Sequence, residues 1–421
     1  MKLKILLRRR VGKAILLAEP YIFSIPAFFV YIGLVFVKVI KRKRVVFYEL
    51  TCSQIGHLAA NTELFLRRLK YANYYDKENN IYIGLCNHFP VSNRQLLNMY
   101  KRDNYIIESR ILKGLFNTWI KKTEFYHIPP MNSNEYYEFN NYTNILNFTE
   151  EEKILGKQLL KEMGIGEKDW FVCFHSRDSE YLGSCYHDYR DSDINNYMLA
   201  AEYIAEKGGY ALRMGAVVDK PLPKERHPKI IDYATEYRSD FMDIYLAAHC
   251  KFFLGNTAGI FLVYTVFNIP VACANIVPLE YPPFRTGDLF IPKKMWSRDK
   301  KRFLTYKEIL DSGAGLYLES KQYENAGIEV VENSSDEILE LAREMNMRLD
   351  KNYESTDEDE ELQRKYISLF KPNNHCYGTQ ARIGTYFLRK NIELLDLRYA
   401  EKEKLFCQPI RNENLIKNHI K

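Results

Sequence analysis

The residues best suited to chemistry follow an apolar run, residues 171–174, that reads as a buried strand. His175 and Arg177 come directly after it, and because one residue separates them, an extended backbone places both side chains on one side. Ligands of open α/β sheets bind at the carboxyl ends of strands, and a guanidinium suits a pyrophosphate, while a histidine could donate to a leaving oxygen. The alternative is an ion pair of Arg177 with Asp178 or Glu180.

A second candidate anion site is the turn Gly-Asn-Thr-Ala-Gly at residues 255–259, after the apolar run 250–254. Small residues let backbone N–H groups approach an anion, and the start of the next helix adds partial positive charge. Asn256 and Thr257 could add side-chain hydrogen bonds, and Arg213, at the end of a neighbouring strand, would add a cation. A plain strand-to-helix turn is the alternative interpretation.

A third candidate lies in the turn 54–57 (Gln-Ile-Gly-His), which follows the first predicted strand. An imidazole titrates near working pH, so His57 could act as a general base, although a single histidine is more often structural. Asp103 and Glu108 are weaker candidates for the same role.

No metal site is expected. The Asp-Ser-Asp at 191–193 matches a metal-binding Asp-x-Asp pattern, but one of these side chains is well placed to cap the helix that follows. The acidic run 357–361 is typical of a solvated helix face. The eight cysteines form no Cys-x-x-Cys pair and no Cys/His cluster, which argues against zinc and against a disulfide framework. We therefore expect a body that lies in the cytoplasm, with Cys173 and Cys250 as buried thiols.

Strands and helices alternate along the chain, which predicts parallel sheets in two Rossmann-like domains. Residues 126–148, rich in Tyr, Asn and Pro, are expected to be a surface segment that joins the domains. Strands are predicted at residues 45–50, 81–86, 171–174, 210–215, 229–232, 250–254 and 269–274, and helices at 58–70, 149–163, 195–207, 242–248 and 260–267.

The amino-terminal residues 1–44 differ from the rest of the chain. Eleven basic residues and one acidic residue stand there, so the remainder is net negative although the whole chain is +6, which excludes a basic nucleic-acid-binding body. Residues 20–37 carry no charge and reach the lower length limit for a membrane span. We expect a helix that lies in, or dips into, the cytoplasmic leaflet, with a buried core helix as the alternative.

Four motifs together carry a resemblance. They are His-x-Arg (175–177), Tyr-Arg-Asp-Ser-Asp (189–193), Arg-Met-Gly (213–215) and Leu-Gly-Asn-Thr-Ala-Gly (254–259). This order resembles an uncharacterised bacterial glycosyltransferase family of surface-polysaccharide gene clusters and, more distantly, the fucosyltransferase superfamily. The resemblance implies the GT-B fold, in which two Rossmann-like domains face a cleft.

The resemblance also implies a division of labour. The carboxyl-terminal domain would hold a nucleotide-sugar, the amino-terminal domain a glycan or lipid-linked acceptor, and the helices around Ala381 to Leu388 would brace the first domain. The resulting domain prediction is a membrane-associating segment at 1–44, an acceptor domain at 45–148, a donor domain at 149–345, and helices with a tail at 346–421.

The expected reaction is displacement at the anomeric carbon without metal or other cofactor, at the cytoplasmic face of the inner membrane. Side chains would stabilise the leaving nucleoside diphosphate, which is the task of a metal in other transferases. The catalytic candidates are His57, His175 and Arg177, and the donor-binding candidates are Arg190, Arg213, Gly215, Asn256, Thr257, Ala258 and Gly259.

Two other classes of function fit the same residues. One is pyruvyl- or phospho-transfer to a polysaccharide on the same fold, and the other is a non-catalytic scaffold that binds a nucleotide or sugar. A nucleotide hydrolase is disfavoured because the chain lacks the Gly-x-x-x-x-Gly-Lys-Ser/Thr loop.

Overall fold

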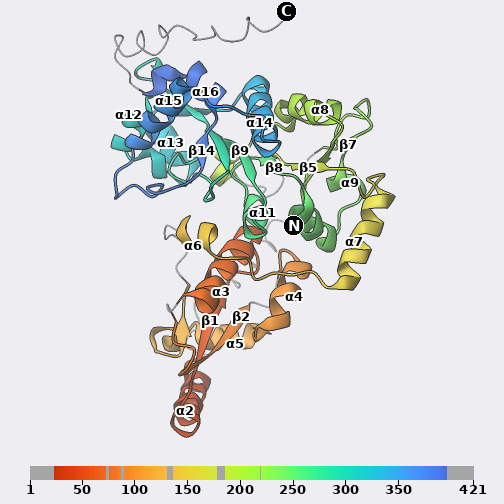
Figure 1. Ribbon diagram of the computed structural model, residues 1–421. Helices are drawn as coiled ribbons and strands as arrows, with labels where there is room; N and C mark the ends of the chain where they lie inside the picture. Colours follow the sequence, from red (N-terminus) through yellow and green to blue (C-terminus); the bar gives the residue numbers. More distant parts are fainter. Residues whose placement is uncertain are drawn as a thin grey trace, which may run out of the picture.

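The computed structural model describes residues 23–72, 75–86, 90–129, 136–177, 185–218 and 220–395. The basic residues before 23, the carboxylates Asp178 and Glu180, and the tail after 395 therefore lie outside the described residues. Two α/β units stand one above the other, the first at the lower end of Figure 1 and the second at the upper end.

The first unit is built on a four-stranded sheet with the strand order β3-β2-β1-β4, in which all pairs are parallel. Its strands are β1 (Arg44–Leu50), β2 (Asn80–Cys86), β3 (Ile106–Glu108) and β4 (Tyr126–His127). The two longer strands confirm the sequence prediction. The segment 126–148 is not simply a surface connection, because it begins with β4 and contains α6 (Tyr136–Asn141). A strand of two residues is too short to show a periodic pattern.

The helices of the first unit cover its sheet and reach the second unit (Figure 1). They are α2 (Ser24–Lys41), the π-helical turn η1 (His57–Asn61), α3 (Thr62–Tyr71), α4 (Arg94–Asp103), α5 (Arg110–Phe116), the 3₁₀ turn η2 (Trp119–Lys122) and α6.

The second unit is built on a seven-stranded parallel sheet with the order β14-β10-β9-β8-β5-β6-β7. Read from β7, this is the order of a dinucleotide-binding Rossmann sheet with one strand added. Every residue of β5, β8 and β9 is buried, as expected of a sheet covered on both faces. The strands are β5 (Phe171–Phe174), β6 (Tyr210–Arg213), β7 (Ile230–Ile231), β8 (Phe253–Gly255), β9 (Val271–Ile276), β10 (Leu289–Pro292) and β14 (Arg382–Ile383).

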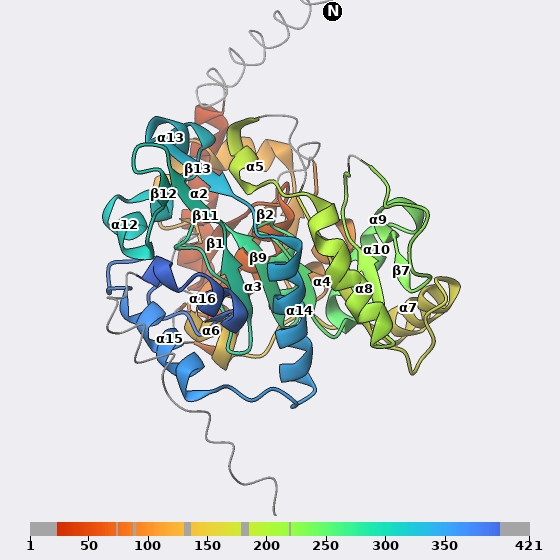
Figure 2. The same ribbon diagram turned by 90° about the horizontal axis from the view of Figure 1, so that it is seen from above.

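Helices lie on both sides of this sheet (Figure 2). A capping box begins α7, because the Thr149 side chain accepts from the Glu152 N–H and the Glu152 side chain accepts from the Thr149 N–H. The helices are α7 (Glu150–Glu162), α8 (Met198–Glu206), α9 (Tyr233–Glu236), α10 (Asp240–His249), α11 (Phe261–Val266), α12 (Tyr306–Asp311), α13 (Ser320–Asn325), α14 (Ser335–Leu349), α15 (Asp357–Ser368) and α16 (Thr385–Lys390).

Short elements complete the second unit. A small antiparallel sheet contains β12 (Arg302–Phe303), β11 (Lys294–Ser297) and β13 (Ile328–Val331). The 3₁₀ turns are η4 (Cys185–Arg190), η5 (Ile194–Tyr197), η6 (Ala314–Leu316) and η7 (Ile392–Leu395).

The carboxyl-terminal segment extends the second unit. Arg382–Ile383 form β14, which pairs with β10, and α16 packs against α14 and α15. The expectation that Ala381 to Leu388 brace the first domain was therefore wrong. The segment pairs with the free edge of β10, which the sequence pattern of a two-residue strand could not reveal.

The two units are joined by close backbone contact and by buried charge. A Cβ atom built on Gly56, before η1, would lie 2.8 Å from the Gly259 Cα in the second unit. Arg67 of α3 donates from Nη2 to the carbonyl of Val266, 2.9 Å away, at the end of α11. The Arg67 guanidinium is also paired with Glu63 at 2.9 Å, and both side chains are fully buried. The two units are therefore packed tightly against each other along α11, from the turn before this helix to its last residue.

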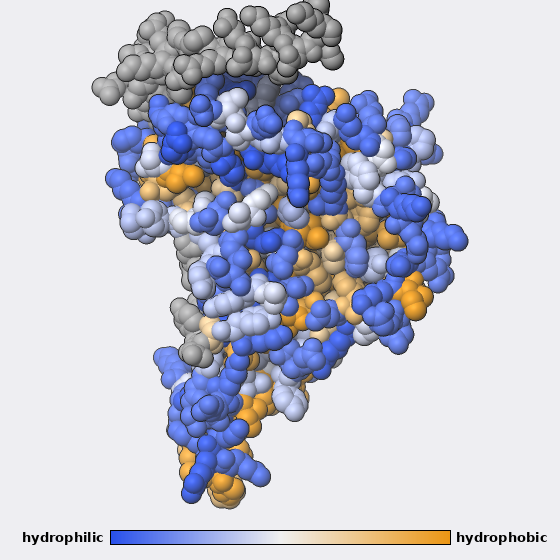
Figure 3. Space-filling model, viewed as in Figure 1, coloured by the Kyte–Doolittle hydropathy of each residue, from blue (hydrophilic) through white to orange (hydrophobic). Residues whose placement is uncertain are grey.

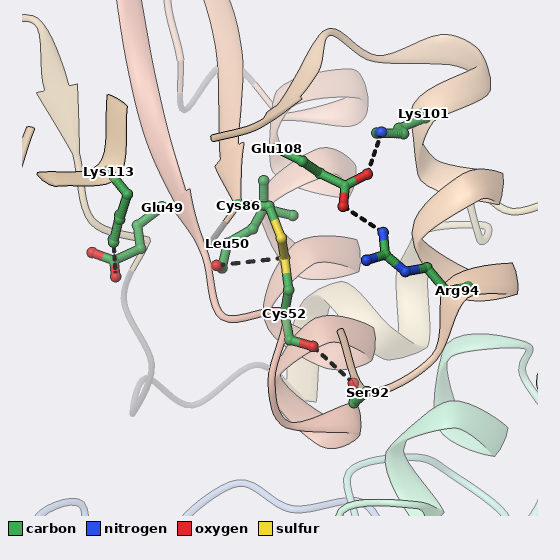
Figure 4. The surroundings of a disulfide bond; sticks show 9 residues. All are labelled: Glu49, Leu50, Cys52, Cys86, Ser92, Arg94, Lys101, Glu108 and Lys113. Carbon is green, nitrogen blue, oxygen red and sulfur yellow. Dashed lines mark hydrogen bonds and ion pairs between the residues drawn. A yellow bond between two sulfur atoms is a disulfide. The ribbon is translucent and has the colours of Figure 1, made fainter. Parts of the chain in front are cut away.

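A disulfide joins Cys52 and Cys86 (Figure 4). Cys86 ends β2 and lies beside Leu50 in the register of β1 and β2, which brings Cys52 within a Cα–Cα distance of 6.0 Å. This corrects the expectation that the cysteines form no disulfide, since a sequence separation of 34 residues gives no hint of strand register. Cys173 and Cys250 are buried free thiols, as expected.

Candidate functional site

The strand order of the second sheet reverses between β5 and β8, and ligands of such sheets bind at the carboxyl ends of the strands beside that point. His175 and Arg177 follow β5, and the turn 255–259 begins at the last residue of β8. The Arg177 N–H donates to Asn256 Oδ1 at 3.2 Å, so the structure brings these two predicted motifs together.

The segment 187–192 is the third part of the site, and Asn256 fastens it to the strand ends. Asn256 is fully buried, and its Nδ2 donates to the Arg190 carbonyl at 3.1 Å and to Ser192 Oγ at 2.9 Å. Thr257 Oγ1 donates to the Asn275 carbonyl at 3.3 Å and accepts from the Val277 N–H at 3.1 Å. These two side chains hold the loops in place, and their part in donor binding stays a prediction.

Arg190 is a half-buried cation that forms no ion pair among the described residues. Its Nε and Nη2 donate to the Thr257 carbonyl at 3.0 and 2.6 Å, while Nη1 has no hydrogen-bond partner and no carboxylate lies within ion-pair distance, in the part of the chain that the structure describes. Burial lowers the pKa of Arg190, and the nearby Arg177 lowers it further. An anionic ligand would stabilise a guanidinium in such a partly desolvated place.

Lys293 is a second such cation, which the sequence analysis did not name. It follows β10, its exposed fraction is 5%, and its Nζ donates to the Asp191 carbonyl at 2.6 Å. Within the described ranges no carboxylate lies within ion-pair distance of Nζ. Burial lowers the pKa of Lys293 to about 8, against the opposing effect of Glu332 and Asp191. The apolar run 289–291 is typical of a strand, and ligands bind at the carboxyl ends of strands. Lys293 could therefore have been predicted from the sequence.

The two residues that follow β5 are tied to the protein. Arg177 lies with Nε 3.4 Å from Asp191 Oδ1 and donates from Nη1 to the His187 carbonyl at 3.1 Å, so its charge is partly compensated. His175 Nδ1 lies 2.8 Å from the Met214 carbonyl. Because a carbonyl only accepts, Nδ1 carries a proton in this contact.

Arg213 does not lie open to a ligand. Its exposed fraction is 2%, its Nη1 lies 3.5 Å from both carboxylate oxygens of Asp232, and it donates to the Lys220 carbonyl at 2.5 Å. Gly215 is needed for space, since a Cβ there would lie 2.6 Å from Val218 Cγ1. Both residues support the strand end that carries His175.

The end of the 255–259 turn serves contact between the units. The Ala258 N–H donates to the Asn256 carbonyl at 2.7 Å, and a Cβ on Gly259 would lie 3.1 Å from the Gly56 nitrogen. The Ala258 N–H is therefore already bonded within the turn, and anion binding by the other N–H groups of the turn stays a prediction.

On the first unit, His57 begins η1, next to the glycine contact. Its Nδ1 lies 3.4 Å from Asn61 Nδ2. Burial lowers the pKa of His57, and Arg190 across the interface lowers it further, so the imidazole is neutral at pH 7 and near the cation cluster. Glu108, an alternative base, is paired with Arg94 and Lys101 (Figure 4), and Asp103 is exposed at the end of α4.

The described residues contain no group of three or more His, Cys, Asp or Glu side chains that could hold a metal ion. Asp193 caps η5 by accepting from the Asn195 N–H at 2.9 Å, as predicted, and Asp191 faces Arg177. The metal-free reaction stays a prediction.

Comparisons with known proteins give only remote likenesses. No family model and no curated protein matches the chain. A glycosyl transferase family 9 structure from Veillonella parvula DSM 2008 has a TM-score of 0.47 and 10% identity, covering 73% of this chain and 98% of its own. The E. coli ADP-heptose LPS heptosyltransferase II has a TM-score of 0.35 and 11% identity, covering 54% and 84%. The iron-containing glycosyltransferase TibC from E. coli H10407 has a TM-score of 0.31 and 10% identity, covering 57% and 61%.

Likenesses of this size assign no function to the chain. The α/β class with parallel sheets is confirmed by the strand pairing of the structure itself. The resemblance to fucosyltransferases stays a prediction.

Proposed function

We propose that the protein is a glycosyltransferase of the GT-B type that moves a sugar from a nucleotide-sugar to a glycan or lipid-linked acceptor in bacterial surface-polysaccharide synthesis, without a metal ion. The observation that carries the proposal is a pair of cations, the half-buried Arg190 and the buried Lys293, which have no carboxylate within ion-pair distance among the described residues. Arg190 belongs to the segment that Asn256 fastens at the switch point of a Rossmann sheet, and Lys293 Nζ bonds to the same segment. A nucleotide diphosphate is the expected ligand of such a switch point.

The cation cluster suits the departure of a nucleoside diphosphate. As the bond between the anomeric carbon and the diphosphate oxygen breaks, its electron pair stays on the diphosphate, and the acceptor oxygen forms the new bond to carbon. Arg190 Nη1, Lys293 Nζ and part of the Arg177 guanidinium would face the developing charge. Fixed cations in a site closed to water stabilise such charge strongly, as a metal does elsewhere.

On the opposite side, His57 is the proposed base for the acceptor hydroxyl. Its depressed pKa keeps it able to accept a proton at neutral pH. Acceptance at Nε2 requires a proton on Nδ1, which Asn61 stabilises when its amide turns so that Oδ1 faces the ring. The glycine contact at Gly56 would hold His57 against the donor unit.

We further propose that the protein works at the inner membrane, on its cytoplasmic face, where the apolar α2 would attach it. The Cys52–Cys86 disulfide counts against a reducing compartment, because disulfides persist mainly in oxidising ones. Thiol counting on protein isolated under alkylation from its native host would decide: reduced Cys52 and Cys86 fit the cytoplasm, and a retained disulfide overturns that placement.

The function is tested by incubating the full chain with a panel of nucleotide-sugars and a glycan acceptor and measuring the released nucleoside diphosphate. Arg190→Met should abolish release, whereas Arg364→Met, an exposed arginine of α15, should not change it. Absence of release from every donor, with nucleoside diphosphate binding retained in calorimetry, would contradict the enzyme and favour a binding scaffold.

A further inference from the structure

The helix α2 is apolar up to its last turn, and one stripe of it is docked on the first unit. Ala27 is fully buried, and Tyr31 packs edge-on against Trp119 and Phe125, with ring centroids 5.2 and 5.6 Å apart. Near the end of the helix, Lys38 Nζ pairs with Glu124 at 2.8 Å. The docked stripe thus runs almost the full length of α2.

The opposite stripe of α2 is uncovered. Large apolar side chains repeat there at helical spacing, with exposed fractions between 48% and 72%: Ile25, Phe28, Phe29, Ile32, Phe36, Val39 and Ile40. Figure 3 shows apolar surface at the lower tip of the molecule, where Figure 1 places α2, at the end farthest from the second unit. Contiguous apolar surface of this kind marks an interaction site.

Positive charge borders this stripe. Lys41 ends the helix, Arg42 and Lys43 follow it, and all three are exposed. Lys121 and Lys122 are also exposed in η2, the turn that packs against α2 through Trp119. Exposed lysines and arginines beside an apolar surface complement anionic lipid headgroups.

We propose that α2 and η2 form a platform that binds an anionic membrane surface with α2 lying in the plane of the membrane rather than across it. A helix of 18 residues is ~27 Å long, slightly short of the ~30 Å hydrocarbon core. To cross the bilayer, α2 would also have to leave its docked stripe, because Tyr31 and Lys38 otherwise carry Phe125 and Glu124 into hydrocarbon. In the plane, the protein covers one stripe and lipid covers the other.

The proposal rests on the membrane association proposed above but not on the sugar chemistry, so vesicle binding and sugar transfer can fail separately. Full-length protein is sedimented with vesicles of phosphatidylcholine alone or mixed with phosphatidylglycerol. We expect binding to the anionic vesicles, reduced about 100-fold by Phe29→Glu with Phe36→Glu. The matched control, Ile154→Glu with Leu155→Glu on the exposed face of α7, should bind like the wild type.

The orientation is tested with single Trp replacements at Phe29 and Phe36, which share one face of α2 seven residues, or ~10 Å, apart along its axis. Fluorescence quenching by lipids brominated at one acyl position, measured against the wild type, should be equal at both positions. A clear difference in quenching would show a helix that crosses the membrane and would overturn the proposal.

Two more results would overturn it. Equal binding of wild type and the Glu double variant to anionic vesicles would remove the apolar stripe from the interaction. A dimer in lipid-free solution that the double variant converts to monomer, without vesicle binding by the wild type, would make the stripe an interface between copies of the chain. Near-ultraviolet circular dichroism checks that each variant is folded.

Discussion

The first sheet, β3-β2-β1-β4, has the same strand order as four neighbouring strands of the second sheet, β7-β6-β5-β8, yet the two switch points differ in charge. Beyond β1 stand Cys52, held in a disulfide, and His57, whose pKa is lowered by burial. Beyond β5 and β8 the chain gathers Arg177 and Arg190. The same scaffold therefore presents a neutral base on one side and cations on the other.

In the proposed reaction the two sites have different tasks. A neutral imidazole can take a proton but cannot hold a diphosphate, and a cluster of cations can hold a diphosphate but offers no base. The contact between Gly56 and Gly259 brings the unit that carries the imidazole and the unit that carries the cations together. Substitutions can therefore disturb the neutral base and the cations separately.

The largest effect is expected on the neutral side. His57→Gln should lower kcat by about 10²- to 10⁴-fold, the usual contribution of a general base, and leave the donor Kd unchanged. Steady-state kinetics with a saturating donor, together with calorimetry of donor binding, measure both quantities. A loss of donor affinity without a loss of kcat would show that His57 binds the donor, as the cations are proposed to do, and is not the general base.

A substitution of Arg213 tests whether this cation of the second unit stabilises the fold or binds the ligand. Arg213→Leu leaves Asp232, which is fully buried, without its partner, so the free energy of unfolding should fall by about 3–5 kcal/mol. Urea denaturation measures this, and Arg364→Leu on the surface should change it by less than about 0.5 kcal/mol. An Arg213 variant of wild-type stability that no longer binds nucleotide would instead assign this arginine to the donor site.

The contact between the two units is tested at Gly56. Its backbone is helical, at φ −63°, so Ala adds no backbone strain, but its Cβ would lie 2.8 Å from the Gly259 Cα. Gly56→Ala should cost about 1–3 kcal/mol of stability by overpacking. Gly33→Ala, where a Cβ meets nothing within 4 Å, is the control and should cause no loss. Equal unfolding curves for both variants would show that the two units do not depend on this contact.

The smallest effect is a pH dependence on the cationic side. The pKa of Lys293 is lowered to about 8, with Glu332, Asp191 and Asp188 favouring its charge and Arg177 opposing it. Raising the pH through this value removes the proton and the positive charge, so donor affinity should fall by up to about tenfold per pH unit above pH 8. Calorimetry from pH 7 to about 9.5 measures the slope, and Lys293→Arg, which stays charged, should flatten it. A wild-type slope that persists in this variant would point to another group.

The sequence predicted much of the site because strand ends are readable from apolar runs. His175 and Arg177 were found in this way, and they do meet the 255–259 turn. The roles of Asn256 and Thr257 were not readable, because their side chains bond to the segment 187–192 and to the start of the segment after β9, which are distant in sequence. Lys293 was missed because its importance comes from its burial and from the lack of an ion-pair partner among the described residues, which depend on the fold.

By itself, the sequence determined the alternation of strands and helices, the apolar helix near the amino terminus and the residues at the end of β5, because periodicity and turn chemistry are local properties. Only the tertiary structure decided that Cys52 meets Cys86, that Arg382 and Ile383 join the second sheet, and which cations keep a carboxylate partner. The reason is that register, burial and charge pairing depend on residues far apart in the chain, which folding alone brings into contact.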